Sequence, residues 1–336
     1  MDKTLARAAV RDGVLTERGD VAFPRVIDAT IVSDWRKCPH AFFRRHVCGL
    51  SKPGSSVHLH FGSVIARGLE IARRTYFSTR DTSDALHDAC EAVIHAWGDF
   101  APPDNPSRTE AAKTLSAALH TLQSYFREWP LDDDPIQIHV RDGAPCIEYS
   151  GALPIPSSRH PDTGEPILYA GRFDLIGDYQ HSVWGLDDKT TGSDPNTDYW
   201  RAQWKLRSQF TGYVWLAREY GVNLKGFIVR GMGVMKTDIK LGWALAPRPP
   251  WMIDAWLAQL QADTHQMCQQ YMQFMDERDD HAFGQSVSHP FSQRFDTACA
   301  DFGGCSYLDL CSSEHPDSWL DSYEVRRWDP LTRQET

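Results

Sequence analysis

The chain has 336 residues, of which 41% are hydrophobic and 24% are charged, and its formal net charge is −10. This composition is typical of a globular protein with one large domain or two smaller ones. The sequence has no apolar run long enough to cross a membrane, and its first 20 residues lack the apolar core of a secretory signal. We therefore expect a soluble, cytoplasmic protein. The acidic balance argues against broad, non-specific nucleic-acid binding but allows a local basic groove.

Helical patterns dominate the first 135 residues. Four helices are expected, at 30–50, 61–77, 83–100 and 107–129. Ser33 is the expected N-cap of the first helix. Ser107 and Glu110 form a capping box that is expected to open the fourth, and Pro130 ends it. The last three of these helices are predicted to form a helical lobe.

After residue 135 the apolar period shortens to that of β-strands. Strands are predicted at 136–140, 146–155, 167–178, 182–188, 226–235 and 240–246, with helices at about 199–220 and 250–277. We expect four segments: an N-terminal arm at 1–29, the first helix and helical lobe at 30–135, an α/β core at 136–284, and a cysteine-rich tail at 285–336. The tail lacks periodicity, so it is expected to be irregular, and its clustered cysteines are expected to hold it against the N-terminal segment.

Acidic side chains end two neighbouring predicted strands. "GRFD" ends in Asp174, and "WGLDDKT" carries Asp187, Asp188 and Lys189. Alternate strand residues share a face, so Asp187 and Lys189 point together, and a hairpin through "GDYQHS" can place Asp174 beside Asp187. Two close carboxylates repel, and a divalent cation such as Mg²⁺ relieves this repulsion. The pattern suits metal-assisted phosphodiester hydrolysis, with Lys189 positioning or helping to deprotonate a metal-bound water. The alternative is a surface hairpin with an Asp187–Lys189 salt bridge.

The helix predicted at 199–220 combines basic and aromatic residues. Gln209 and Tyr213 are four residues apart and share one face. Just before them, basic residues alternate with tryptophans in the order Trp200, Arg201, Trp204, Lys205 and Arg207. Phosphates take such charges and bases stack on such rings, so Arg201, Trp204, Lys205 and Arg207 are predicted to bind DNA. The alternative is an amphipathic helix whose tryptophans lie in the core.

The motifs "GRFD", "GLDDKTTG" and "QFTGY" together resemble the PD-(D/E)XK nuclease superfamily in its RecB-like branch, whose pattern is G-x-x-D, D-x-K-T and Q-x-x-x-Y. The resemblance implies a restriction-endonuclease-like core, with a central mixed sheet flanked by helices, and a Mg²⁺- or Mn²⁺-dependent deoxyribonuclease. It implies metal ligation by Asp174, Asp187 and the main-chain carbonyl of Asp188, and catalysis by Lys189. Gln209 and Tyr213 would orient the DNA or the active site. Glu148 is a lesser candidate, with a surface strand position as its alternative.

The same resemblance gives expectations about biology. It favours a phage-type exonuclease that acts on DNA ends or single strands in recombination, repair or replication, with a recombination or replication protein as partner and no membrane. A CRISPR-adaptation nuclease of the same branch is a close variant, although those proteins are usually shorter. A bacterial or phage-infected cell would be its setting.

Eight cysteines occur, and three of them cluster near the C-terminus. In a reducing compartment such clusters more often bind metal than form disulfides. One subgroup of RecB-like nucleases carries an iron–sulfur cluster on one cysteine before the core and three after it. By this resemblance Cys38, Cys299, Cys305 and Cys311 would hold a [4Fe–4S] cluster, which four thiolates suit. Their wide spacing leaves Zn²⁺, or no ligand, as alternatives. The others are expected to be packing residues: Cys48, Cys90, Cys146 and Cys268.

One position departs from the family pattern. RecB-like proteins usually carry a metal-binding histidine in a G-x-x-x-H setting, and "FGSVIARGLE" has Ala66 there. Alanine cannot bind a metal, although His58 or His60 just upstream could reach the site from another angle. Two further functions therefore stay open. One is an inactive DNA-binding or partner-binding protein with this fold, and the other is an unrelated zinc-stabilised α/β protein.

Overall fold

The computed structural model describes residues 21–54, 56–279, 289–295, 298–299, 304–314 and 316–335. Residues 1–20 of the predicted arm, and parts of the predicted tail, lie outside the described residues. The chain forms two compact units. The first unit comprises Met1–Gly54, Gly151–Gly171 and Asp254–Thr336, and the second comprises Ser55–Ser150 and Arg172–Ile253. The boundaries predicted from the sequence stay a proposal.

The central sheet is mixed, as predicted. Its long strands are β6 (Ile147–Pro154), β7 (Leu168–Tyr179), β8 (Ser182–Thr191), β9 (Leu224–Val234) and β10 (Ile239–Pro247). Strands β7 and β8 form an antiparallel hairpin, β8 runs parallel to β9, and β9 is antiparallel to β10. Gln180 and His181 form the hairpin turn with φ values of 46° and 59°, the left-handed conformation that tight hairpin turns require. The six predicted strands all contain strand structure.

Short strands complete the set. They are β1 (Val26–Ile27), β2 (Leu50–Ser51), β3 (Gln137–Ile138), β4 (Val140–Arg141), β5 (Ala144–Pro145), β11 (Glu324–Val325), β12 (Trp328–Asp329) and β13 (Gln334–Glu335). Strand β3 extends the sheet by pairing with the end of β7, and β1 pairs in parallel with its beginning.

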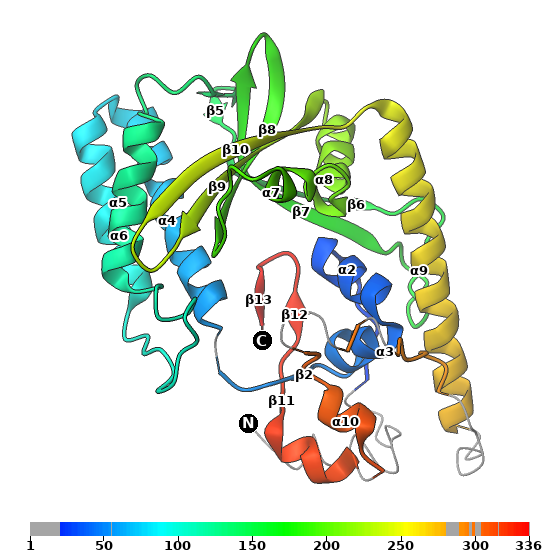
Figure 1. Cartoon of the computed structure of the whole chain (residues 1–336). Coiled ribbons are helices and arrows are strands. Elements are labelled where there is room, and N and C mark those ends of the chain that lie inside the picture. Colours follow the sequence, from blue (N-terminus) through cyan, green and yellow to red (C-terminus); the bar gives the residue numbers. More distant parts are fainter. Residues whose placement is uncertain are drawn as a thin grey trace. The chain divides into compact units, whose positions relative to one another are not determined.

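Three helices lie side by side in the second unit (Figure 1): α4 (Val57–Thr79), α5 (Thr82–Trp97) and α6 (Leu115–Glu128). Their apolar stripes, including Leu69 and Leu122, share one buried cluster with Met232 and Val234 of β9. These helices therefore cover the sheet face on which the even-numbered residues of β9 lie. This is the helical lobe that the sequence predicted.

The capping box forms but does not open α6. The Ser107 N–H donates to Glu110 Oε2 at 2.8 Å, and the Glu110 N–H donates to Ser107 Oγ at 3.3 Å. These bonds close an isolated turn, and α6 begins after Thr114, whose Oγ1 accepts from the Ala117 N–H at 3.1 Å. A capping box satisfies the free N–H groups of any helical turn, so the sequence motif located the turn and not the longer helix.

The helix predicted at 199–220 is two helices, α7 (Asp198–Ala202) and α8 (Ser208–Glu219). Arg207 has extended backbone dihedrals and separates them. The Phe210 ring of α8 stacks on Phe227 of β9 at 4.6 Å between centroids. Since Phe227 is an odd-numbered residue of β9, α8 covers the sheet face opposite to the helical lobe.

The first unit contains the other helical elements. They are α2 (Ala29–Lys37), α3 (Pro39–Phe42), the π-helical turn η1 (Phe43–Val47), α9 (Pro250–Asp279, which begins in the second unit), α10 (Leu308–Ser312) and the 3-10 turn η4 (Pro316–Ser322). Helix α2 is capped by Asp28 and not by Ser33, because Asp28 Oδ1 accepts from the Ile31 N–H at 2.9 Å. Strand β11 of the tail pairs with β2. No helix of the described chain is both long and apolar enough to cross a bilayer.

Candidate active site

The β7–β8 hairpin brings together the two carboxylates that the sequence singled out. Leu175 pairs with Leu186, and one further step along this register sets Asp174 opposite Asp187. The Asp188 main-chain N–H donates to Asp174 Oδ2 at 3.0 Å. The Lys189 ammonium lies 2.5 Å from Asp187 Oδ2. Two acids and one amine therefore meet where the hairpin strands diverge, as the alternation of strand residues requires.

Burial makes this cluster electrostatically unusual. The Asp187 side chain is 4% exposed, and burial raises its pKa to about 7, with the Asp174 charge adding to the rise and Lys189 opposing it. Burial lowers the Lys189 pKa, but the charges of Asp187 and Asp174 outweigh it, and the Lys189 pKa is raised. Asp187 and Lys189 therefore form an ion pair whose carboxylate is buried. The alternative interpretation, a salt bridge at the surface of the hairpin, would have a solvated carboxylate.

The carboxylate pair fits a divalent cation. The negative charges of Asp174 and Asp187 repel each other. A divalent cation bound by the carboxylate oxygens would relieve this repulsion. When both carboxylates are ionised, Lys189 supplies one positive charge against two negative charges, so one negative charge of the cluster remains for a metal to balance.

Gln209 and Tyr213 of α8 lie next to this cluster. Gln209 Nε2 donates to the Tyr213 hydroxyl at 3.3 Å, and Tyr213 contributes to the raised Lys189 pKa. The Tyr213 ring lies 5.0 Å from Phe173 and 5.9 Å from Phe227 between centroids. Packing against these rings holds the helix face that carries Gln209 and Tyr213 toward the hairpin, as the four-residue spacing predicted.

Asp188 points to the other face of the sheet, into a buried network that the sequence analysis missed. Asp188 Oδ2 accepts from Arg73 Nη2 at 2.6 Å, and Asp188 Oδ1 accepts from the Tyr125 hydroxyl at 2.8 Å. Arg230 donates to the Tyr125 hydroxyl at 3.0 Å and to both carboxylate oxygens of Asp134 at 2.6 and 2.8 Å. The Asp188 side chain is thus fully engaged, so only its main-chain carbonyl is left for the ligand role that the resemblance implies.

Arg73 lies in a predicted helix and Arg230 in a predicted strand, and neither belongs to a motif that marks it as functional. Burial lowers the pKa of each guanidinium, but the neighbouring acidic groups outweigh it and raise the pKa. A signal was present in the sequence, because a charged residue at an apolar position of a helix or strand needs a buried partner.

The predicted DNA-binding residues divide into two groups. Arg201, Lys205 and Arg207 are exposed, whereas Trp204 is 6% exposed and packs against Trp200 and Phe210. Trp204 is thus a core residue, as the alternative has it, and the prediction that it stacks on DNA bases does not fit because its side chain is buried.

An exposed aromatic residue of this segment was overlooked. Tyr199 is 83% exposed and lies two residues before Arg201 in α7. It stands beside the tryptophans in the sequence, and only the tertiary structure shows that it is the solvated ring.

The upstream histidines have neighbours of their own. His60 stacks on Phe100 at 3.9 Å between ring centroids and meets Trp97 at 5.2 Å. His58 is exposed and interacts electrostatically with Glu110. These contacts give both residues a structural explanation and supply no replacement for the histidine that Ala66 lacks.

Glu148 is half-buried, and its Oε2 lies 2.8 Å from Arg172 Nε. Glu148 is a strand residue of β6, as the alternative has it, but its side chain is only 13% exposed and is therefore not at the surface; its part in the site stays a prediction.

The four cysteines of the predicted cluster belong to one compact unit. Burial raises the Cys311 pKa, and Cys305, Cys38 and Cys299 raise it further, so the four sulfur atoms lie in one neighbourhood. The Cys305 N–H donates to the Cys299 carbonyl at 2.9 Å. Yet within the described residues no three His, Cys, Asp or Glu side chains converge closely enough to hold a metal ion. Four cysteine thiols are suitable ligands for an iron–sulfur cluster or a zinc ion. Among the residues that the structure describes, however, they do not converge into a complete ligand set.

A mixed sheet flanked by helices, with two acids and a lysine at the open end of one hairpin, defines a nuclease-like α/β core. A family model of the PD-(D/E)XK nuclease superfamily matches residues 29–312. The chain belongs to this superfamily. Its members are nucleases that typically use Mg²⁺ or Mn²⁺ to cleave phosphodiester bonds, and the fold implies DNA as the substrate.

A search of curated proteins gave no match. Among solved structures, a chain described as "Crystal structure of SSO0001" is 15% identical, with a TM-score of 0.28, over 73% of this chain and 78% of that chain.

Proposed function

We propose that this chain is a Mg²⁺- or Mn²⁺-dependent deoxyribonuclease of the RecB-like branch that works as an exonuclease in DNA recombination, repair or replication. The observation that carries the proposal is the cluster of Asp174, Asp187 and Lys189, in which a buried carboxylate has its pKa raised by burial and by a second acid. Such perturbed groups gather at functional sites.

Each residue of the cluster has a distinct part in the proposal. Asp174 and Asp187, with the Asp188 carbonyl, would hold the metal ion, which when bound polarises the phosphate and makes bound water more acidic. Lys189 has a raised pKa and keeps its proton at neutral pH, so it orients the attacking water or the phosphate by donating hydrogen bonds. Gln209 and Tyr213 of α8 hydrogen-bond to each other, and Tyr213 acts electrostatically on that ammonium, so the pair would orient the active site from this side.

The DNA would approach along α7 and the turn that follows it. Arg201, Lys205 and Arg207 are exposed there and can pair with backbone phosphates, and Tyr199 offers a free ring to a base. The net charge of −10 makes such a local surface more important, because the rest of the molecule repels DNA on average.

The cysteines belong to the same proposal. Cys38, Cys299, Cys305 and Cys311 would hold a [4Fe–4S] cluster, with Zn²⁺ as the alternative, and the centre would tie the tail to the N-terminal segment within the first unit. Binding free energy at such a centre acts as folding free energy. Support comes from the shared neighbourhood of the four sulfur atoms.

The deciding experiment is a cleavage assay on end-labelled single-stranded and duplex DNA with Mg²⁺ or Mn²⁺. Asp174→Asn and Lys189→Met should each reduce cleavage by at least about a hundredfold, the usual scale for one catalytic group, while circular dichroism stays unchanged. Asp178→Asn is the matched control, because Asp178 is exposed on the same hairpin and contacts His139 at 3.0 Å. If either site variant cuts DNA as fast as the parent, the site is assigned wrongly.

A second candidate function is supported by Ala66, which lacks the metal-binding imidazole of the family motif. In that case the chain binds DNA or a partner protein without cutting. The two functions separate in the same assay, since a binding protein retards labelled DNA in a gel but leaves it intact at any Mg²⁺ or Mn²⁺ concentration.

A further inference from the structure

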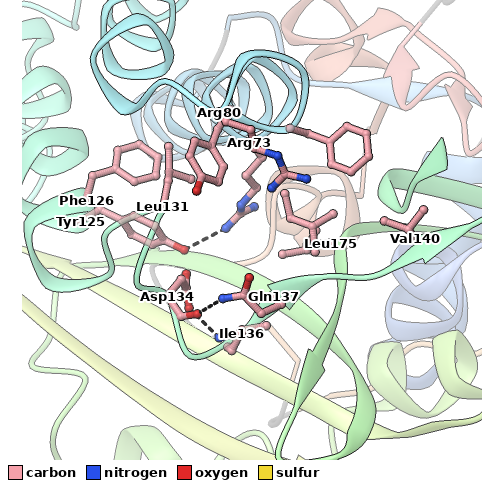
Figure 2. Close-up of a pocket in the computed structure, with 13 residues that line it drawn as sticks. Arg73, Arg80, Tyr125, Phe126, Leu131, Asp134, Ile136, Gln137, Val140 and Leu175 are labelled. Atoms are coloured by element: carbon pink, nitrogen blue, oxygen red, sulfur yellow. Dashed lines mark hydrogen bonds between the residues drawn. The ribbon is translucent and has the colours of Figure 1, made fainter. Parts of the chain in front are cut away.

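The second unit contains a cavity of about 140 Å³, and Figure 2 draws the residues that line it. Leu175 lines it and is adjacent to Asp174 in β7, so the cavity lies on the sheet face opposite to the Asp174–Asp187 cluster. Its wall is formed by α4, α6 and the segment that leads into β3, with Leu175 of β7 at one side. A dry cavity of this size can hold a benzene ring, and it exceeds the volume of a single water several times. It therefore has room for one small chemical group.

One end of this cavity is a guanidinium with spare donors. The Arg73 side chain is 5% exposed. Its Nη2 donates two hydrogen bonds, to the Tyr125 hydroxyl at 2.8 Å and to Asp188 Oδ2 at 2.6 Å. Among the described residues, no acceptor bonds to Arg73 Nε or Nη1. Figure 2 shows the guanidinium reaching toward Tyr125 within the cavity. An arginine that is buried with unused N–H groups is a ready donor to an oxyanion.

A second arginine lines the same cavity without an acidic partner. Arg80 is the C-cap that follows α4, and its guanidinium lies 5.6 Å from the Tyr76 ring centroid and 5.3 Å from the Phe77 ring centroid. Within the described chain, Arg80 makes no ion pair. The rings hold the side chain over the cavity wall and do not neutralise its charge.

The charges around the cavity do not balance. Arg73 and Arg230 are matched by Asp188 and Asp134, whereas Arg80 is exposed and has no acidic partner among the described residues. An anion in the cavity would balance this charge and would accept hydrogen bonds from Arg73. A planar or tetrahedral oxyanion fits the size of the cavity, and arginine pairs best with carboxylate and phosphate.

The geometry points to a binding site for a phosphate group, held by Arg73 inside the cavity and by Arg80 at its mouth. Tyr76 and Phe77 line the same cavity beside Arg80, so a ligand whose phosphate carries a planar ring can also contact aromatic side chains there, and a mononucleotide is the ligand class that uses both features. Inorganic phosphate shares the recognised group and is the other source. The proposal concerns binding alone and does not depend on nuclease activity.

The test is calorimetric titration of the full-length protein with 5′-AMP, inorganic phosphate and adenosine. We expect 5′-AMP to bind, inorganic phosphate to bind equally or more weakly, and adenosine to give no heat. Arg80→Gln should weaken 5′-AMP binding about tenfold, because one charge-assisted contact is lost. Val140→Trp, at an exposed position of the cavity wall, should weaken it by obstructing the cavity.

The matched control is Arg67→Gln, which removes an equal charge from α4 at a side chain that pairs with Glu70 at 2.7 Å and does not line the cavity. It should bind 5′-AMP like the parent. Four results would overturn the proposal: no binding of either phosphate compound at millimolar concentration, equal binding of adenosine, unchanged binding in both cavity variants, or equal weakening by Arg67→Gln.

Discussion

Buried charges of the second unit are accommodated in two different ways. Asp188 and Arg73 form a hydrogen-bonded ion pair beside Tyr125. Lys113 is 3% exposed, lies 4.6 Å from the Phe61 ring centroid and makes no ion pair within the described residues. Burial accordingly lowers its pKa to about 8. The paired charge is retained by its partners, whereas the single one costs free energy.

Lys113→Met should stabilise the protein at pH 7. The folded pKa of Lys113, about 8, lies below the ordinary lysine pKa of 10.5 that it has in the unfolded chain, so above pH 8 the unfolded chain holds more protons than the folded one. The stability of the parent therefore rises between pH 8 and 10.5, while the variant lacks this rise. We expect the variant to be more stable by roughly 1–3 kcal/mol at pH 7 and the gain to shrink by pH 10.5. Urea unfolding across this pH range measures both; an equal gain at every pH would contradict the explanation.

Asp188→Asn should destabilise the fold by about 3–5 kcal/mol, because it leaves the Arg73 guanidinium buried without its counter-charge. Chemical unfolding at pH 7 measures the loss, with Asp178→Asn as the exposed carboxylate control. A cost equal to that of the control would show that Arg73 finds another acceptor, and the buried network would then not depend on Asp188.

At the scale of elements, β8 serves both faces of the sheet because its side chains alternate. Asp187 and Lys189 face α8, and Asp188 between them faces the helical lobe. The loop after β8 and helix α7 pack closely against β9. A Cβ on Gly231 of β9 would lie 2.5 Å from Pro195 and 2.5 Å from the Trp200 ring. Gly231 pairs with Lys189, so this close approach fixes α7 beside the candidate active site.

Gly231→Ala should lower stability by about 1–3 kcal/mol through overpacking and should reduce DNA binding, since it displaces the segment that carries Tyr199 and Arg201. Gly192→Ala is the control, because a Cβ there would make only an ordinary 3.4 Å contact with Thr109. Thermal unfolding and gel retardation test the two effects. Normal DNA binding by a destabilised Gly231 variant would separate this loop from the DNA surface.

At the scale of the whole molecule, each unit is assembled from separate stretches of the chain. The first unit joins the N-terminal segment, a middle segment and the tail, and β11 pairs with β2 across more than 270 residues of sequence. The Tyr307 hydroxyl donates to the Leu50 carbonyl at 2.6 Å. Regular structure in the described part of the tail is limited to α10, η4 and three two-residue strands, so a thiolate-bound centre would contribute much to its stability.

Cys305→Ser should therefore lower thermal stability more than it lowers cleavage. Protein purified without oxygen should be brown and contain iron if a [4Fe–4S] cluster is bound, whereas zinc leaves it colourless. Elemental analysis and thermal unfolding are the measurements, and Cys90→Ser, in α5 of the other unit, is the control. Equal melting of the Cys305 variant and the parent would rule out a stabilising centre.

The sequence by itself determined where the long strands lie along the chain, the hairpin and the meeting of Asp174, Asp187 and Lys189, because alternation along a strand and a short turn are local rules. It also determined the Gln209–Tyr213 pair, which needs only helical spacing. The tertiary structure decided which of several aromatic residues is solvated: Trp204 is buried and Tyr199 is not. It alone revealed the network of Arg73, Tyr125 and Arg230 around Asp188, because the burial and pairing of charges depend on contacts between residues far apart in the chain.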